Sequence, residues 1–98
     1  MIAGVSEQED NIIKNILQPF SSEFSFYYYG SRVKGNYTKL SDLDILIKGN
    51  KEFTELSKIK FAFDNSDLPY IVNFTDYTNI SSSFYKLIEN DLVNVFSK

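Results

Sequence analysis

The run LDILIK at residues 43–48 is the stretch that most constrains the fold. It is short, apolar and partly β-branched, and it closes on Gly49-Asn50. This is the pattern of a buried strand that ends in a turn, because a strand covered on both faces has a continuous apolar run. The segments on either side of this strand then decide the fold class.

The flanking segments alternate between helical and extended patterns. Ser6 and Glu9 have capping-box spacing before isoleucines at helical intervals, and Pro19 ends that pattern. In chain order we predict a helix at 6–18, a strand at 24–29, a loop or short helix, the strand at 43–48, a helix at 51–63, a strand at 70–77, a helix at 81–90 and a short strand within 93–96. This order implies an α/β fold in which a small mixed β-sheet packs against helices.

Composition limits the chemistry of this chain. Its 98 residues, 43% of them hydrophobic, suit one domain spanning residues 1–98. The formal net charge of −3 argues against direct nucleic-acid binding, which usually needs a basic patch. Without Cys or His, any chemistry must come from carboxylates, hydroxyls, amides and a few cations. No apolar run could span a membrane and the N-terminus lacks a basic region, so we expect a cytoplasmic location and no membrane partner.

The stretch GSRVKGNYTKLSDLD at residues 30–44 carries the candidate functional groups. A strand that ends in Gly30 and Ser31 before a new helical turn presents backbone N–H groups and a hydroxyl to an anion, and glycine lets a phosphate approach closely. Arg32 and Lys34 add two cations to the same loop. The alternative is an ordinary turn with both cations in solvent.

Asp42 and Asp44 end this stretch two residues apart. On a strand both side chains leave the same face, while Leu43 and Ile45 point to the other. Two neighbouring carboxylates repel each other unless a cation neutralises them, and Mg²⁺ prefers carboxylate and phosphate oxygens. The alternative is an aspartate that caps a turn beside one solvated acid.

Other known motifs do not fit these residues. Gly30 and Gly35 have Walker A spacing, but Asn36 and Tyr37 stand where lysine and serine or threonine are required. DLDILIKGNKEF fails as an EF-hand, since Leu46 occupies a ligand position. A DxD motif of a sugar-nucleotide enzyme would need a larger domain.

The combined motif resembles the signature of the minimal nucleotidyltransferases of the DNA polymerase beta superfamily. The residues that carry the resemblance are Gly30-Ser31-Arg32, Gly35 and Ser41-Asp42-Leu43-Asp44, following a strand. The order of elements agrees from about residue 6 to the C-terminus. The resemblance implies the DNA polymerase beta-like fold and an enzyme that moves a nucleotide, commonly AMP from ATP, onto an acceptor with release of pyrophosphate.

The same resemblance assigns roles to individual residues. Gly30 and Ser31 would hold the triphosphate of ATP, with Arg32 and Lys34 as further nucleotide-binding groups. Asp42 and Asp44 would ligate catalytic Mg²⁺, with a two-metal site as one arrangement. Nucleotidyl transfer depends mostly on positioning and charge neutralisation, so this small set of groups is chemically sufficient.

Asn73 departs from the family pattern. The family usually brings a third carboxylate from the next strand, and the corresponding run here is Val72-Asn73-Phe74-Thr75-Asp76. Asn73 therefore stands at the third catalytic position, where its amide can coordinate a cation weakly but cannot accept a proton. Asp76 is a poor substitute, since three residues along a regular strand place it on the opposite face.

Two hypotheses about function follow, beside a third reading in which the fold is right and the site is inert. In family members of this size the gene often neighbours one for a helical HEPN protein, in a pair that resembles a toxin and an antitoxin. The first hypothesis is a transferase that adenylylates such a HEPN partner. The second is a weakened or inactive transferase-fold antitoxin that acts by binding its partner. A homodimer is also compatible with a small aromatic-rich chain.

Overall fold

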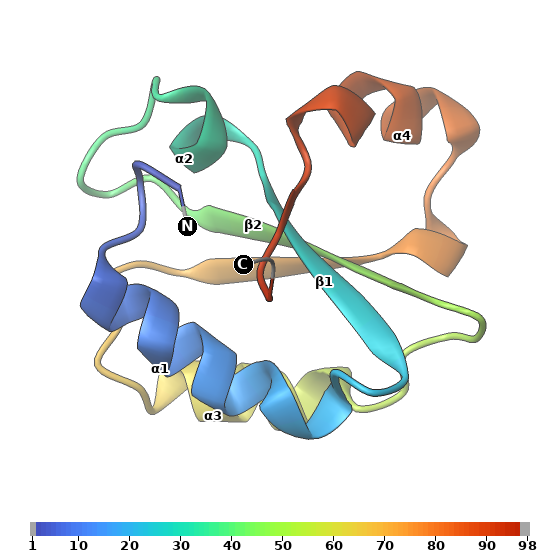
Figure 1. The fold of residues 1–98 in the computed structure, drawn as a ribbon, viewed down its shortest axis with the longest axis horizontal. Helices are drawn as coiled ribbons and strands as arrows, with labels where there is room; N and C mark the ends of the chain where they lie inside the picture. The colour runs from blue at the N-terminus through green and yellow to red at the C-terminus, as the bar shows by residue number, and fades with distance from the viewer. Residues whose placement is uncertain (1, 97–98) are drawn as a thin grey trace.

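The computed structural model describes residues 2–96, which form a four-stranded sheet with strand order β3-β2-β1-β4 (Figure 1). The strands are β1 (Phe24–Tyr29), β2 (Leu43–Gly49), β3 (Val72–Asp76) and β4 (Val93–Asn94). Strand β1 is antiparallel to β2 and to β4, whereas β2 and β3 are parallel. The sheet is therefore mixed, which confirms the fold class predicted from the sequence.

Helices cover both faces of this sheet. The α-helices are α1 (Glu7–Leu17), α2 (Ser31–Lys34), α3 (Leu56–Asp64) and α4 (Ser82–Ile88), and the 3-10 helices are η1 (Gln18–Phe20), η2 (Tyr77–Asn79) and η3 (Glu89–Asp91). Helices α1 and α3 pack on one face and α4 lies on the other (Figure 1). None of the helices within residues 2–96 is long and apolar enough to cross a membrane.

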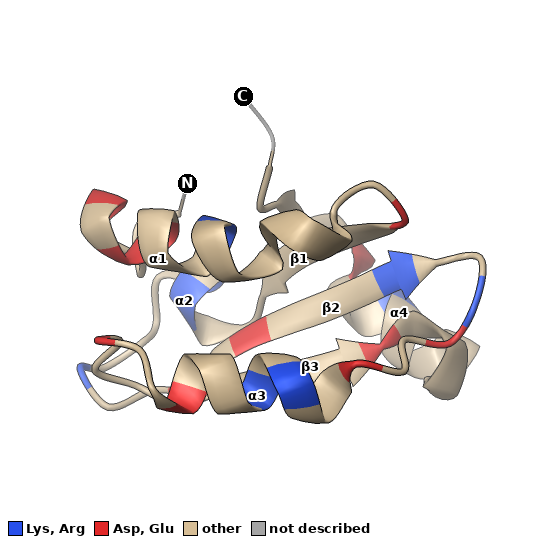
Figure 2. Cartoon of the chain, turned by 90° about the horizontal axis from the view of Figure 1, so that it is seen from below, with Lys and Arg blue, Asp and Glu red and all other residues tan. Residues whose placement is uncertain are grey.

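Two apolar clusters hold these layers together. The cluster between the sheet and α1 and α3 has as its most buried members Ile13, Leu17, Phe26, Tyr28, Leu43, Ile45, Ile47, Ile59 and Val95. The cluster on the α4 side consists of Tyr29, Leu46 and Ile88, with Tyr27, Tyr77, Ile80, Tyr85 and Leu92 packed around them. Because neighbouring residues of a strand point to opposite faces, Asp44 and Lys48 share the α4 face with Leu46. Figure 2 shows this acidic group near the start of β2 and the basic group at its end.

Helix α1 begins where the sequence predicts. The Ser6 hydroxyl accepts from the Glu9 N–H at 3.1 Å, and the Glu9 carboxylate accepts from the Ser6 N–H at 3.0 Å. This capping box satisfies N–H groups that have no partner inside the helix. After Leu17 the chain tightens into η1, where Pro19 prevents a longer α-helix.

The helix predicted at 51–63 is wrong at its start, because α3 begins only at Leu56. The Phe53 N–H donates instead to the Asp76 carboxylate at 2.8 Å. The Phe53 ring packs edge-on against Phe24 and Phe20, with centroids 4.9 and 5.4 Å away. Burying this aromatic ring from an extended segment outweighs the local helical pattern.

The third strand is shorter than the predicted 70–77, since β3 ends at Asp76. The Asp76 carboxylate accepts from the Thr78 N–H at 3.0 Å and thereby starts the tight turn of η2. The last helix is likewise shortened to α4, with Ser81 as its N-cap, and the short final strand is confirmed as β4.

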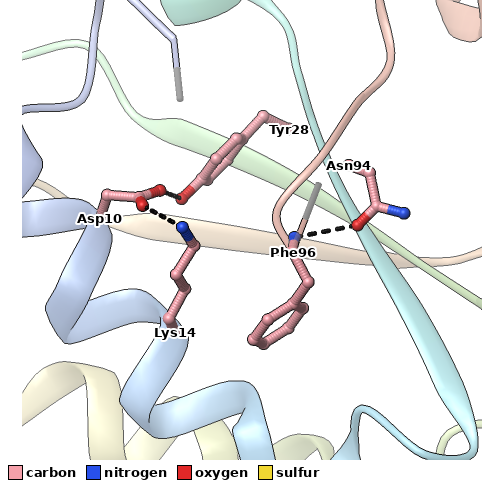
Figure 3. Close-up of polar contacts among 5 residues, drawn as sticks. All are labelled: Asp10, Lys14, Tyr28, Asn94 and Phe96. Atoms are coloured by element: carbon pink, nitrogen blue, oxygen red, sulfur yellow. Dashed lines mark hydrogen bonds and ion pairs between the residues drawn. The ribbon is translucent and has the colours of Figure 1, made fainter. Parts of the chain in front are cut away.

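A buried polar network joins α1 to β1 (Figure 3). The Tyr28 hydroxyl donates to Asp10 Oδ1 at 2.7 Å, and Lys14 Nζ lies 2.7 Å from Asp10 Oδ2. Asp10 is only 3% exposed, so its carboxylate depends on these two partners. Burial, together with the Asp10 carboxylate, raises the pKa of the Tyr28 phenol above its ordinary value of 10.0.

This network predicts that the protein loses stability at alkaline pH. In the unfolded chain Tyr28 ionises near its ordinary pKa, whereas the folded state keeps the proton to higher pH. The free energy of unfolding therefore falls as pH rises above about 10, by up to about 1.4 kcal/mol per pH unit for this group. Urea denaturation across that range should give a shallower fall for Tyr28→Phe than for the wild type. Parallel pH curves for the two proteins would contradict this assignment.

Candidate active site

The parallel strands β2 and β3 bring the predicted catalytic residues together, and β1 adds a tyrosine beside them. Tyr29 of β1 pairs with Asp44 of β2, and Asp44 pairs with Asn73 of β3, so these residues form one row across the sheet. Asp42 lies just before β2, two residues from Asp44. The row faces the α4 side, as the alternation along β2 requires.

The Asn73 side chain contacts Asp42 directly. Its Nδ2 donates to Asp42 Oδ2 at 2.9 Å, at an exposed position. An amide carries no charge, so it avoids the repulsion that a third carboxylate at this position would add to Asp42 and Asp44. Asn73 therefore stabilises the two aspartates in the absence of a cation.

Asp44 is half-buried and Asp42 is exposed. Burial raises the pKa of Asp44 above its usual value, the neighbouring Asp42 raises it further, and the Asn73 amide opposes both effects. A carboxylate that is buried beside a second carboxylate favours the binding of a cation, which stabilises its charged form.

Gly30 lies directly against Asp44. It has φ 87° and ψ −159°, a backbone conformation that is open essentially to glycine alone. A β carbon at this position would collide with Asp44 Oδ2. Glycine thus lets the turn between β1 and α2 approach the carboxylate, and it places Ser31 at the start of α2 beside the acidic pair.

Helix α2 is a single turn that starts at Ser31. The Val33 and Lys34 N–H groups both donate to the Gly30 carbonyl at 3.1 Å. The N–H groups at the first positions of a helix have no partner within it and point toward its N-terminus. Lys34 is exposed and lies 3.5 Å from the Asp91 carboxylate, a weak surface pair that leaves its ammonium group available to an anion.

Arg32 is placed differently from its expected role as a nucleotide-binding cation. Its guanidinium is buried, with 4% of the residue exposed, and it donates to backbone carbonyls rather than facing outward. It also lies over the Tyr70 ring, 3.9 Å from the centroid. We therefore remove Arg32 from the candidate nucleotide-binding groups.

A hydroxyl pair beside the acidic row was not predicted from the sequence. The Tyr29 hydroxyl and Thr75 Oγ1 lie 2.9 Å apart, bridging β1 and β3 across the α4 face of β2. Tyr29 is buried, and burial raises its pKa. The period-two alternation of FSFYYY and of the strand around Asn73 was the available signal, since it puts both hydroxyls on the face of Asp44.

The donor set fits a divalent cation with few protein ligands. Two carboxylates are available, and within residues 2–96 there is no group of three or more His, Cys, Asp or Glu arranged to hold a metal ion. Mg²⁺ is commonly held by one or two carboxylates together with substrate phosphates and water. Asp42 and Asp44 meet that requirement, with the Asn73 amide in place of a third acid.

The hollow around Phe20, Phe24 and Phe53, of about 300 Å³, lies elsewhere. Its lining residues come from the segment that leads into β1 and from the segment that follows β2, whereas Asp42 and Asp44 lie at the start of β2. This hollow therefore does not belong to the acidic site.

A Gly-Ser turn held against Asp44 of the central strand β2, with Asp42 two residues earlier, is the arrangement expected of a nucleotide-transferring enzyme. Comparison with known proteins agrees: the family model described as "Nucleotidyltransferase domain" matches residues 10–95. The chain belongs to this family of nucleotidyltransferases.

The chain is also similar to one curated protein and, in its fold, to one solved structure. It is 34% identical over 96 residues to "Probable protein adenylyltransferase MntA" of Haemophilus influenzae, across 96% of this chain and 84% of the relative. Its fold is also similar, with a TM-score of 0.73 and 17% identity, to a chain of a solved structure described as "Crystal structure of the toxin-antitoxin with AMP-PNP". That likeness covers 91% of this chain and 73% of the other and supports the same fold.

Proposed function

We propose that this chain is a Mg²⁺-dependent nucleotidyltransferase that transfers AMP from ATP to a protein partner of the HEPN type. The observation that carries the proposal is the contact between the Gly30 turn and Asp44, which joins a phosphate-binding turn to an acidic pair. The relative named as a protein adenylyltransferase supports AMP as the transferred group and a protein as the acceptor. The solved toxin-antitoxin structure with AMP-PNP supports a toxin as that acceptor.

Each proposed residue has a separate task. Gly30 and Ser31 offer backbone N–H groups and a hydroxyl to the triphosphate, and Lys34 adds a cation at the end of the same helical turn. Asp42 and Asp44 would hold Mg²⁺, which would neutralise phosphate charge and orient the triphosphate when bound. The row of strands keeps both carboxylates on the face that the nucleotide approaches.

The proposed reaction is a displacement at the α-phosphorus of ATP. A hydroxyl oxygen of the acceptor forms the new P–O bond, the bond to the β-phosphate oxygen breaks, and pyrophosphate leaves. The hydroxyl proton passes to solvent, because the Asn73 amide cannot take it up. Rate enhancement then rests on positioning and charge neutralisation rather than on a strong base.

A specific observation also favours the second candidate function, a weakened or inactive transferase that acts by binding its partner. The Asn73 amide already donates to Asp42, so it occupies one carboxylate oxygen that a cation would use. Such a chain would retain the fold and nucleotide binding but would transfer AMP slowly or not at all.

The test is transfer of label from α-labelled ATP with Mg²⁺ to the product of the neighbouring gene, the proposed HEPN-type partner. We expect label on the partner with the wild-type chain and none with Asp42→Asn, which keeps the shape of the side chain and removes one charge. A partner that binds the wild-type chain stably but gains no label would reject transfer and support the binding function. Label that persists with Asp42→Asn would contradict the assignment of the acidic site.

A further inference from the structure

Arg32 is a buried arginine that has no acidic partner among residues 2–96. The ion pairs within residues 2–96 join Lys14 to Asp10, Lys34 to Asp91 and Lys51 to Glu23, and none involves Arg32. Burying an unpaired charge is strongly unfavourable unless other groups compensate for the lost hydration. The compensation here comes from carbonyl oxygens and aromatic rings, so the surroundings of Arg32 indicate what it does.

The guanidinium connects three separate segments. Its Nη1 donates to the Gly4 carbonyl at 2.6 Å, its Nε donates to the Ser41 carbonyl at 3.0 Å, and its Nη2 donates to the Lys39 carbonyl at 3.2 Å. Its flat face lies over the Tyr70 ring. Arg32 therefore ties the N-terminal segment and the loop after α2 to the residue that leads into β3.

The contact with Ser41 bears directly on Asp42. The Ser41 carbonyl belongs to the peptide group that precedes Asp42, and a peptide group is planar. On the other side of Asp42, the Leu43 N–H donates to the Ile71 carbonyl at 2.9 Å. The backbone of Asp42 is thus held on both sides. Arg32 binds the peptide group before it, and Ile71, the residue that precedes β3, binds the peptide group after it.

We infer that Arg32 is a positioning residue that sets the location of the Asp42 carboxylate through the Ser41 carbonyl, without touching nucleotide or metal. Lysine cannot take this role, because its single ammonium group does not form the fork that reaches both Gly4 and Ser41. The inference rests on the proposed function only where it says that the position of Asp42 matters for catalysis. The placement of Asp42 itself can be measured without any transfer reaction.

The hydrogen bond from Asn73 to Asp42 supplies that measurement. Its presence shifts the side-chain amide resonances of Asn73 in an NMR spectrum, and Asp42→Ala defines their position when the bond is lost. We expect Arg32→Lys, which keeps the charge, to move these resonances most of the way to the Asp42→Ala position. Ile59→Val, a mildly destabilising change at a buried position of α3, should leave them in place.

Gly4→Ala tests the same contact without changing Arg32. A β carbon at Gly4 would lie 2.5 Å from Arg32 Cβ and 2.7 Å from the Arg32 carbonyl oxygen, so Arg32 has to move. We expect the Asn73 resonances to shift in the same direction as in Arg32→Lys. The affinity for Mn²⁺, read from paramagnetic broadening, should fall by about 10-fold in both variants.

Two results would overturn the inference. One is unchanged Asn73 resonances in folded Arg32→Lys or Gly4→Ala protein, and the other is an equal shift in Ile59→Val. If the Asn73 resonances respond as expected but the wild-type chain transfers no label to its partner, the proposed function fails and the placement of Asp42 by Arg32 stands. The two proposals can therefore fail independently.

Discussion

Gly30→Ala is expected to abolish AMP transfer while the protein stays folded. The added β carbon would meet Asp44 Oδ2, and the positive φ of this residue is unfavourable for alanine. The turn must then withdraw from Asp44, which separates the phosphate-binding groups from the acidic pair. A displacement of this kind costs about 100-fold or more in rate. The measurement is the initial rate of label transfer from α-labelled ATP to the partner.

Gly35→Ala provides the control for that experiment. Gly35 also has a positive φ, of 90°, but a β carbon there would meet no atom within 4 Å. Gly35 lies in the left-handed region, with ψ −1°, so the variant suffers a milder backbone strain than Gly30→Ala and no collision at Asp44. We expect a small loss of thermal stability and a rate close to that of the wild type. Equal losses of transfer in the two variants would show that strain, rather than contact with Asp44, decides the rate.

Asn73→Asp is expected to raise the rate of transfer by about 10- to 100-fold, because it restores a carboxylate that can bind a cation and accept a proton. The same change removes the amide donor to Asp42 and places three acids together. Without a divalent cation the variant should therefore be less stable than the wild type, and its melting temperature should rise with Mg²⁺ concentration. Transfer rates and melting curves at several Mg²⁺ concentrations check both effects.

Asn94→Asp is the matched control, since it makes the same chemical change on β4, at the opposite edge of the sheet from β3. It should alter neither the rate nor the dependence of melting on Mg²⁺. If Asn73→Asp binds Mg²⁺ more tightly but transfers no faster, the third position supplies affinity and not catalysis. If it changes neither property, Asn73 lies outside the functional site.

The candidate site shows which spatial relations between residues can be predicted from the sequence and which cannot. The pairing of Asp42 with Asp44 on one face follows from the alternation of side chains along a strand, which is a local property. The position of Asn73 beside them depends on the parallel pairing of β2 and β3. The family resemblance had led us to expect Asn73 at the third catalytic position, but the local sequence does not predict that pairing. The Gly30 turn was predicted as a phosphate site, but its contact with Asp44 depends on the pairing of β1 with β2.

Arg32 illustrates where local reasoning fails. Arg32 lies two residues from Lys34 in a short loop, so the sequence alone predicted a second exposed cation there. Its burial depends on contacts with Tyr70 and Gly4, both of which lie far from Arg32 in the sequence. The start of α3 fails in the same way, because the position of Phe53 is decided by distant phenylalanines and by Asp76.

By itself, the sequence determined the α1 capping box, the strands around FSFYYY and LDILIK, the placement of the two aspartates on one face and the mixed α/β class. These features depend on interactions within a few residues, and such interactions are the same wherever the segment lies. Only the tertiary structure decided the strand order β3-β2-β1-β4, the late start of α3, the hydroxyl pair of Tyr29 and Thr75 and the structural role of Arg32. Each of these depends on burying groups that are distant in the chain, and the gain in free energy from that burial exceeds local preference.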